Sequence, residues 1–408
     1  MRRLLLVTYA WPPRGGVGLQ RPLAFARHLP RHGWSITVLT TREGPFQTAA
    51  DPEEMRSVAP EQVLEVPFAE GAVALVVAAV ARQARVPDEA ITWIRPAIRA
   101  GRAALRKQPY SAVLSTSPLP SCHLIARSIA QSEAVPWVAD FRDPWTGYHH
   151  EHRDPVRAAA DDWLERRTIR QARLLTTISG PLREYLRLRH PQRIEVISNG
   201  FEPMVSPVLP SSVGPLVLRY QGKLNPHHQD VEPLFRVLAA MRKTGRATPR
   251  TIRVEFRLLG RPLDLAVKAR TYGITDLVEC GPAVPHSESL RLTAEAHAVL
   301  VFDWQDDDVI GPAVVPVKLY DALGTRRPVV LVRARASGAA RDLIQGANAG
   351  FIAENDEQLE SALSRLLDRH QRGDDLTIED SAARHAYEWP TIVGSLSSLL
   401  ESICGVPQ

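Results

Sequence analysis

The sequence contains few cysteines and no apolar run long enough to span a membrane. Its three cysteines, Cys122, Cys280 and Cys404, lie far apart without C-x-x-C spacing. Neither a disulfide framework nor a zinc site is therefore indicated, and a reducing cytoplasm fits. The longest apolar run, 71–81, has about half of the roughly 20 residues that a spanning helix needs. The apolar start of the chain lacks the cleavage site of a signal peptide, so we interpret it as a buried strand.

Lysine is also scarce, which limits what the positive net charge means. Only five of the 50 Lys and Arg residues are lysines, and 45 Asp and Glu residues leave a net charge of +5 spread along the chain. A solvated surface explains this small surplus better than a specific polyanion site, and we predict no nucleic-acid partner. Because lysines are rare, Lys223 and Lys318 stand out in their segments.

Length and pattern predict two α/β domains. A chain of 408 residues is too long for one ordinary core, and strand and helix patterns alternate on both sides of a break with four prolines. We expect a first domain over 1–202, a linker over 203–215, a second domain over 216–380, and a helical segment over 381–408 that packs back on the first domain.

The individual elements follow from the apolar periodicity, and their alternation predicts parallel sheets. The expected strands are 4–9, 35–40, 63–66, 112–115, 137–140, 174–178, 194–197, 216–220, 253–259, 277–280, 298–302 and 328–332. The expected helices are 22–32, 231–241, 287–296, 317–323 and 381–404, the last broken at Pro390.

The first loop after a predicted strand has the composition of an anion site. Gly15 and Gly16 lie between that strand and a helix, where the backbone can approach a ligand and the helix N-terminus favours negative charge. The dinucleotide-binding fingerprint is not met, because Arg21 stands where its last glycine belongs and no acid ends the second strand. A tight turn without a ligand is the alternative.

A second polar group follows the strand at 137–140. Asp140, Arg142 and Asp143 are followed by Trp145 and Tyr148, which brings charge and flat apolar surface into one loop and suits the binding of sugar hydroxyls. The alternative is an internal Arg–Asp pair that locks the loop.

Two segments of the second domain place a lysine beside a glycine or a helix start. Lys223 directly follows Gly222, where an ammonium can reach a phosphate. Lys318 lies in the first turn of a short helix, and Asp321 lies on the same face one turn later. A carboxylate can accept both ribose hydroxyls, and amides at a helix start can bind phosphate. The alternatives are an exposed lysine and a Lys–Asp pair on a helix surface.

Taken together, these segments resemble retaining glycosyltransferases of family 4, in a branch used in polysaccharide assembly, over nearly the whole chain. The resemblance implies the GT-B fold, in which two Rossmann-like domains have the active site in the cleft between them. It also implies a nucleotide-diphosphate sugar of the UDP or GDP type as donor, no cofactor, and retention of anomeric configuration.

The resemblance also assigns roles to individual residues. The donor-binding positions are Gly15, Gly16, Gly222, Lys223, Gly260, Val314, Val315, Lys318 and Asp321, and the acceptor-binding positions are Arg14, Asp140, Trp145 and Tyr148. The catalytic candidates are Asp143, Arg142, Lys223 and Lys318, whose cations stabilise the departing diphosphate. Two family features are absent: Ala313 stands where many members have a glutamate, and Arg142 or Asp143 stands where many members have a histidine. No metal site is predicted, because the acidic run 306–308 reads as a surface loop.

Other functions stay open beside a transferase. A catalytically degenerate nucleotide-sugar-binding protein fits the missing acid at Ala313. The failed fingerprint disfavours a nicotinamide dehydrogenase, and a sugar-nucleotide epimerase of similar fold ranks below both.

The acceptor is a lipid-linked glycan or a small natural product. The segment 71–86, apolar and then carrying Arg82 and Arg85, is either a surface helix that docks on an anionic membrane or part of the core. We expect a cytoplasmic protein, with peripheral contact at the inner membrane face in the first case. Whether the chain forms a homodimer stays open.

Overall fold

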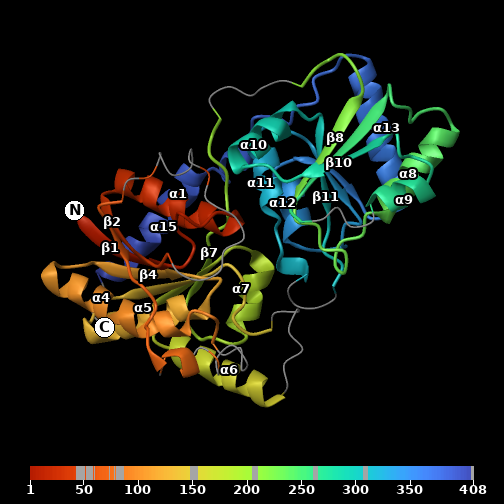
Figure 1. Cartoon of the computed structure of the whole chain (residues 1–408). Helices are drawn as coiled ribbons and strands as arrows, with labels where there is room; N and C mark the ends of the chain where they lie inside the picture. The colour runs from red at the N-terminus through yellow and green to blue at the C-terminus, as the bar shows by residue number, and fades with distance from the viewer. Residues whose placement is uncertain are drawn as a thin grey trace. The chain divides into compact units, whose positions relative to one another are not determined.

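The computed structural model describes residues 1–42, 51, 58, 60–72, 74–77, 79, 87–147, 155–204, 210–260, 265–306 and 311–405. The chain divides into two compact units (Figure 1). Unit 1 consists of Met1–Asn199 with Trp389–Gln408, and unit 2 consists of Gly200–Glu388. Among the described helices, none is long and apolar enough to cross a bilayer.

Within the described residues, unit 1 contains a seven-stranded parallel sheet in the order β3-β2-β1-β4-β5-β6-β7. Strands β2, β4 and β5 are buried along their whole length, as expected for strands with helices on both faces. The strand order reverses between β1 and β4, and ligands of such sheets bind at the carboxyl ends beside this switch point. The strands are β1 (Arg2–Thr8), β2 (Trp34–Thr40), β3 (Gln62–Glu65), β4 (Ala112–Thr116), β5 (Trp137–Phe141), β6 (Leu174–Thr177) and β7 (Ile194–Val196).

Helices cover both faces of this sheet (Figure 1). Right-handed crossovers place α1 (Gln20–His28) on one face and α4 (Ile94–Lys107), α5 (Pro120–Ser132), α6 (Pro155–Ile169) and α7 (Gly180–Arg187) on the other. The shorter turns are η1 (Val17–Leu19), η2 (Leu29–His32) and η3 (Ile91–Trp93).

The last helix, α15 (Trp389–Cys404), returns to unit 1 and packs on the face that carries α1. Trp389, Leu396 and Leu400 join the core formed by Phe25 and Trp34. The indole Nε1 of Trp34 also donates a hydrogen bond to Ser397 Oγ at 3.0 Å. The prediction that the C-terminal helix packs back on the first domain is confirmed.

Unit 2 has a six-stranded parallel sheet among its described residues, in the order β10-β9-β8-β11-β12-β13. The switch point lies between β8 and β11. The strands are β8 (Leu216–Gly222), β9 (Ile252–Leu258), β10 (Val278–Pro282), β11 (Ala298–Phe302), β12 (Val329–Val332) and β13 (Gly350–Ala353). The helices are α8 (Glu232–Lys243), α9 (Leu265–Thr271), α10 (His286–Glu295), η4 (Gly311–Ala313), α11 (Val317–Gly324), α12 (Ala339–Gly346), α13 (Asp356–Gln371) and α14 (Ala382–His385).

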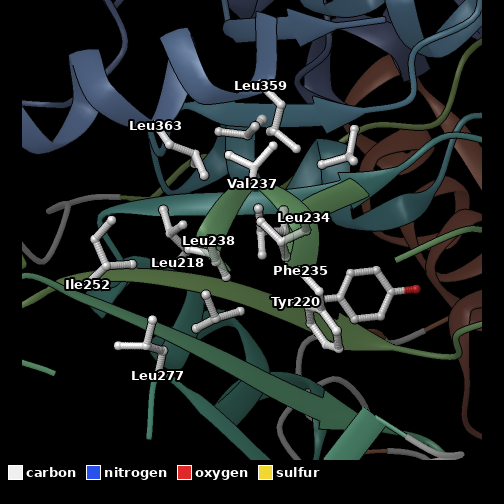
Figure 2. Close-up of a cluster of buried hydrophobic side chains, with 14 of the residues drawn as sticks. Leu218, Tyr220, Leu234, Phe235, Val237, Leu238, Ile252, Leu277, Leu359 and Leu363 are labelled. Carbon is white, nitrogen blue, oxygen red and sulfur yellow. The ribbon is translucent and has the colours of Figure 1, made fainter. Parts of the chain in front are cut away.

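The main core of unit 2 lies between β8, α8 and α13. Figure 2 shows Leu218 of β8, Leu234 and Leu238 of α8, and Leu359 of α13 gathered in this cluster. Tyr220 belongs to the same cluster, and its ring is fully buried. Burial of this apolar surface stabilises the unit and fixes the carboxyl end of β8, which directly follows Tyr220.

The sequence prediction of an α/β fold with two Rossmann-like sheets is confirmed. Strand β13 and the helices α4, α5, α6, α7, α9, α12 and α13 were not among the individually expected elements. Along the chain, unit 1 ends at Asn199 and resumes at Trp389, whereas the sequence placed the first domain's end at 202 and the second's at 380. Part of the expected helix 71–86 lies outside the described residues, but Leu75 and Val76 are 72% and 62% exposed, so these two side chains are not core.

Candidate active site

The switch point of unit 2 brings two predicted donor-binding segments together around Tyr220. The Nζ atom of Lys318 lies 3.6 Å from the centroid of the Tyr220 ring. The Tyr220 hydroxyl donates a hydrogen bond of 2.7 Å to the backbone carbonyl of Lys223. Tyr220 therefore fixes the turn after β8 through its hydroxyl and contacts the Lys318 ammonium of α11 with its ring face. The sequence analysis gave Tyr220 no role.

Gly222 lies beside the Lys318 ammonium. Its φ is +103°, a conformation that favours glycine. A Cβ atom at this position would lie 4.0 Å from Lys318 Nζ. The carbonyl of Gly222 accepts a hydrogen bond of 3.2 Å from the amide of Leu259, which brings Gly260 to the same edge. Gly222, Lys223, Gly260 and Lys318 thus lie at one place, with Lys223 and Gly260 exposed.

Burial changes the acid–base behaviour of Lys318. Desolvation lowers the pKa of Lys318 to about 7, although the carboxylate of Asp321 opposes this shift. The ammonium lies between the ring face of Tyr220 and the backbone of Gly222, with one carboxylate nearby. An approaching anion would therefore stabilise its charged form. The site therefore suits an anionic ligand.

Helix α11 supplies the other predicted contacts. Pro316 precedes its first residue in an extended conformation. The amide of Leu319 donates back to the carbonyl of Pro316 at 3.0 Å, so the amides of Val317 and Lys318 are the ones at the open start of the helix. Val314 is partly exposed and Val315 is 8% exposed in the segment before it. Asp321 is partly exposed one turn after Lys318, as the i, i+3 spacing predicted. Ala313 is buried at 4% exposure.

The loop after Lys223 is held by contacts that the sequence did not reveal. His228 stacks on Trp304 with ring centroids 4.6 Å apart and an interplanar angle of 6°. His228 also pairs with Asp306 at 2.5 Å, and Gln229 donates to the carbonyl of Phe302 at 2.8 Å. Asp306 is therefore paired with a histidine. Among the described residues, no group of three acidic, histidine or cysteine side chains has the geometry of a metal site.

In unit 1, the Gly15–Gly16 turn lies at the carboxyl end of β1. Gly16 is exposed, has a φ of +98°, and precedes η1, and its carbonyl accepts a hydrogen bond of 2.9 Å from Leu19. Arg14 turns inward at 3% exposure, with its guanidinium 4.1 Å from the centroid of the Tyr9 ring and donating to the carbonyl of Thr41. The expected acceptor contact from Arg14 therefore finds no support, because the side chain is buried.

Asp140 anchors the centre of unit 1. It is 1% exposed and accepts two hydrogen bonds from Arg21, at 2.6 and 2.8 Å. Thr116 and Thr176 each donate another at 2.7 Å. Burial alone would raise the pKa of Asp140, but Arg21 and the hydroxyl donors hold it below its usual value. Because both oxygens are fully used, the expected acceptor role of Asp140 is corrected to a structural one. An Arg–Asp pair does lock the loop, but its arginine is Arg21.

The loop after β5 contains the remaining predicted residues. Arg142 donates from its guanidinium to the carbonyl of Gly18 at 2.8 Å, which ties this loop to the glycine turn, and Asp143 is partly exposed beside it. Trp145 is 5% exposed and donates to Asp161 at 3.3 Å, so its ring is packed inside rather than offered to a sugar. Tyr148 lies outside the described residues.

A buried ion network that sequence reasoning missed supports this loop. Glu165 is fully buried and accepts from the amide of Thr146 at 3.1 Å and from His190 at 2.9 Å. Tyr185 donates to the carbonyl of Thr146 at 2.8 Å. The two helices α6 and α7 thereby fix the position of Thr146, three residues after Asp143.

Unit 1 also has a cavity of about 350 Å³ near the carboxyl ends of β2 and β3. Its walls are mostly apolar, and an ion pair of 2.6 Å between Arg42 and Glu65 contributes the charge. This volume is at the lower end of small-molecule sites. The lining residues are Trp11, Pro12, Pro13, Leu23, Arg42, Val58, Pro60, Val63 and Glu65.

Comparison with solved structures gives several relatives of the fold. The chain resembles sucrose-phosphate synthase from Thermosynechococcus elongatus at 14% identity and a TM-score of 0.65, with 99% of each chain covered. It resembles HepE from Anabaena in complex with UDP-glucose at 15% identity and a TM-score of 0.63, with 98% of this chain and 100% of HepE covered. The lipopolysaccharide outer core galactosyltransferase WaaB is similar at 14% identity and a TM-score of 0.60, with 98% and 99% covered.

Comparison with protein families addresses unit 1. Residues 15–200 match the glycosyl transferase 4-like domain, and no curated protein matches the chain. The match begins at the Gly15–Gly16 turn. It ends one residue after Asn199, where the first segment of unit 1 ends. At 14–15% identity, the similarity to solved structures establishes the fold of the chain alone. The chain therefore contains a glycosyl transferase 4-like domain over residues 15–200 and has the GT-B fold.

Proposed function

We propose that this chain is a metal-independent glycosyltransferase that takes a sugar from a nucleotide-diphosphate sugar bound by unit 2. The observation that carries the proposal is the position of Lys318: its ammonium lies 3.6 Å from the Tyr220 ring centroid and faces Gly222. Breaking the anomeric bond places negative charge on the departing diphosphate. A cation and helix-start amides that are already in position stabilise that charge.

The other proposed donor contacts come from residues near the same carboxyl edge of the unit 2 sheet. Asp321 is proposed to accept the ribose hydroxyls, Lys223 to contact the diphosphate, and the amides of Val314 and Val315 to bind phosphate. Gly15, Gly16 and Gly260 stay predicted donor ligands. HepE has been solved with UDP-glucose, and this supports a UDP-type donor for a chain with the same fold.

For unit 1 we propose an acceptor role. Asp143 and Arg142 are the catalytic candidates on this side, and the Glu165 network keeps their loop in place. The cavity beside Trp11 has the size and apolar lining to hold the apolar part of a lipid-linked or small natural-product acceptor. Retention of anomeric configuration is part of the proposal through the family.

The proposal is tested by thermal-shift titration with UDP-, GDP- and dTDP-sugars in the presence of EDTA. A specific donor raises the unfolding temperature by mass action, and we expect one nucleotide class to do so without metal. Lys318→Met should abolish the shift, whereas the exposed Lys243→Met on α8 should preserve it. Equal shifts in both variants, or no shift with any donor, would contradict the proposal.

A catalytically degenerate nucleotide-sugar-binding protein is the second candidate, because buried Ala313 occupies the place of a family acid. The two candidates differ in turnover. A transferase releases nucleotide diphosphate when donor and a suitable acceptor are mixed, and this release should fall with Lys318→Met. Donor binding without release across a broad panel of lipid-linked and soluble acceptors would favour the second candidate.

A further inference from the structure

Helices α4, α5 and α6 lie together on unit 1 (Figure 1). Helix α4 contains four arginines and one lysine and no acid, and α5 contains Arg127 and no acid. Arg102 of α4 reaches α5 and donates to Ser128 Oγ at 3.1 Å, which places its guanidinium beside the residue that follows Arg127. Basic groups from neighbouring helices therefore meet on one surface.

The centre of this surface holds two arginines from different helices without a counter-charge. Burial lowers the pKa of Arg127, and the positive charge of Arg167 on α6 lowers it further. Neither Arg127 nor Arg167 has a carboxylate partner in the described part of the chain, and the same holds for exposed Arg170. Like charges placed together cost free energy, and an anion that binds between them recovers it.

Helix α6 adds an exposed aromatic side chain to these arginines. Trp163 is 61% exposed, whereas the other seven tryptophans are at most 9% exposed. The guanidinium of Arg167 lies 5.5 Å from the centroid of its ring. Trp163 and Arg167 have the i, i+4 spacing of one helix face, and exposed Arg170 directly follows the last residue of α6.

The acids of α6 lie on its inner side or are already paired. Asp161 and Glu165 are fully buried, and Asp162 pairs with Arg166 at 2.7 Å and with Arg189. Their charge therefore does not oppose the outer arginines. The outer face of α6 combines a tryptophan with cations, the composition of segments that lie at a membrane interface.

From this juxtaposition we propose that Arg102, Arg127, Trp163, Arg167 and Arg170 form a docking face for the surface of an anionic phospholipid bilayer. Phosphate headgroups bind between Arg127 and Arg167, and the indole of Trp163 enters the headgroup region. The inference goes beyond the proposed function, because vesicle binding needs neither donor nor acceptor. The exposed Trp163 favours a bilayer over a soluble polyanion, because a bilayer has a headgroup region that an indole can enter.

Co-sedimentation of the full chain with vesicles tests this face. We expect binding to phosphatidylcholine vesicles with 30% phosphatidylglycerol and little binding to phosphatidylcholine alone. Because each basic residue near such a surface contributes about fivefold to binding, Arg127→Gln with Arg167→Gln should weaken it roughly 20-fold. The matched control is Arg242→Gln with Arg372→Gln, two exposed arginines of unit 2, which removes the same charge and should leave binding within about twofold.

Tryptophan fluorescence gives an independent readout of depth. Lipids brominated near the headgroup should quench part of the emission of the wild-type chain, and Trp163→Phe should remove this quenching. Near-UV circular dichroism checks that each variant is folded. Equal binding to neutral vesicles, equal loss in the control variant, or binding to heparin without binding to vesicles would each overturn the proposal. A failed nucleotide titration would not affect these results, so failure of the two proposals can be told apart.

Discussion

The two units share the strand order around their switch points, yet they use the polar groups there differently. In unit 1, Asp140 receives four hydrogen bonds and is 1% exposed. In unit 2, Lys318 faces a ring and a glycine, and its pKa is lowered by burial. The comparison teaches that a charge with all its hydrogen-bond partners in place serves the fold, whereas a desolvated charge with few partners is available to a ligand.

The largest expected effect concerns the charge of unit 1. Asp140→Asn leaves Arg21 buried without its counter-charge, and breaking such a pair costs about 3 to 5 kcal/mol of unfolding free energy. Urea unfolding followed by circular dichroism measures it. Arg21→Met with Asp140→Leu removes both charges and should recover most of the loss. A double variant as unstable as Asp140→Asn would show that the pair is not the cause.

Removing the charge of unit 2 should weaken ligand binding and turnover without destabilising the fold. Lys318→Met keeps an unbranched chain against Tyr220 but loses the cation, and we expect turnover to fall by about two orders of magnitude. Steady-state release of nucleotide diphosphate measures this effect. Lys243→Met is the control. A similar fall in turnover in that variant would show that the loss is not specific to Lys318.

The pH dependence sharpens the comparison further, because Lys318 has a pKa lowered to about 7. Donor binding needs the protonated form, so affinity for a nucleotide sugar should fall roughly tenfold from pH 6 to pH 8. Stability should move the opposite way. Between pH 7 and pH 10 the unfolded chain binds more protons at this lysine than the folded chain, so unfolding free energy rises with pH.

Calorimetric titration at several pH values and urea unfolding over the same range test these slopes. A nucleotide sugar is a better probe than a free nucleotide, since its two phosphates do not titrate near neutral pH. Donor affinity that is flat between pH 6 and pH 8, or unchanged in slope in Lys318→Met, would exclude Lys318 as the titrating group.

The smallest effect is expected at the turn after β8. Gly222→Ala strains a residue with a φ of +103° and places a methyl group 4.0 Å from Lys318 Nζ. We expect a loss of about 1 kcal/mol in stability together with weaker donor binding. Gly245→Ala has a φ of +76° and open space around it, so it should lose stability alone. Equal donor affinity in both variants would mean that the space at Gly222 is unimportant.

Local signals in the sequence were enough for the fold. Strands such as β2 and β4 are rich in apolar and β-branched residues and are buried along their whole length, and the C-terminal helix has its apolar residues at helical spacing. Strand β13 begins with Gly350 and has one fully buried residue, Ala353, so its pattern was too weak to predict.

The candidate site was predictable only in part. The lysine and glycine segments carry a local pattern, and Lys318 and Gly222 do lie together. The pair of Arg21 and Asp140, 119 residues apart, and the stack of His228 on Trp304 depend on which strands become neighbours. Tyr220 has the pattern of an ordinary strand residue, and its contact with Lys318 arises because β11, on which α11 packs, is the neighbour of β8. Such contacts require the folded chain.

The central claim is that Lys318 and Lys223 of unit 2 bind the donor diphosphate. Only five lysines are present, so NMR of chain labelled with ¹³C at lysine Cε resolves each of them, with Lys→Arg variants for assignment. On addition of the donor selected by thermal shift, the signals of Lys318 and Lys223 should move, and the pKa of Lys318 should rise. Unchanged signals for both lysines at saturating donor would contradict the account.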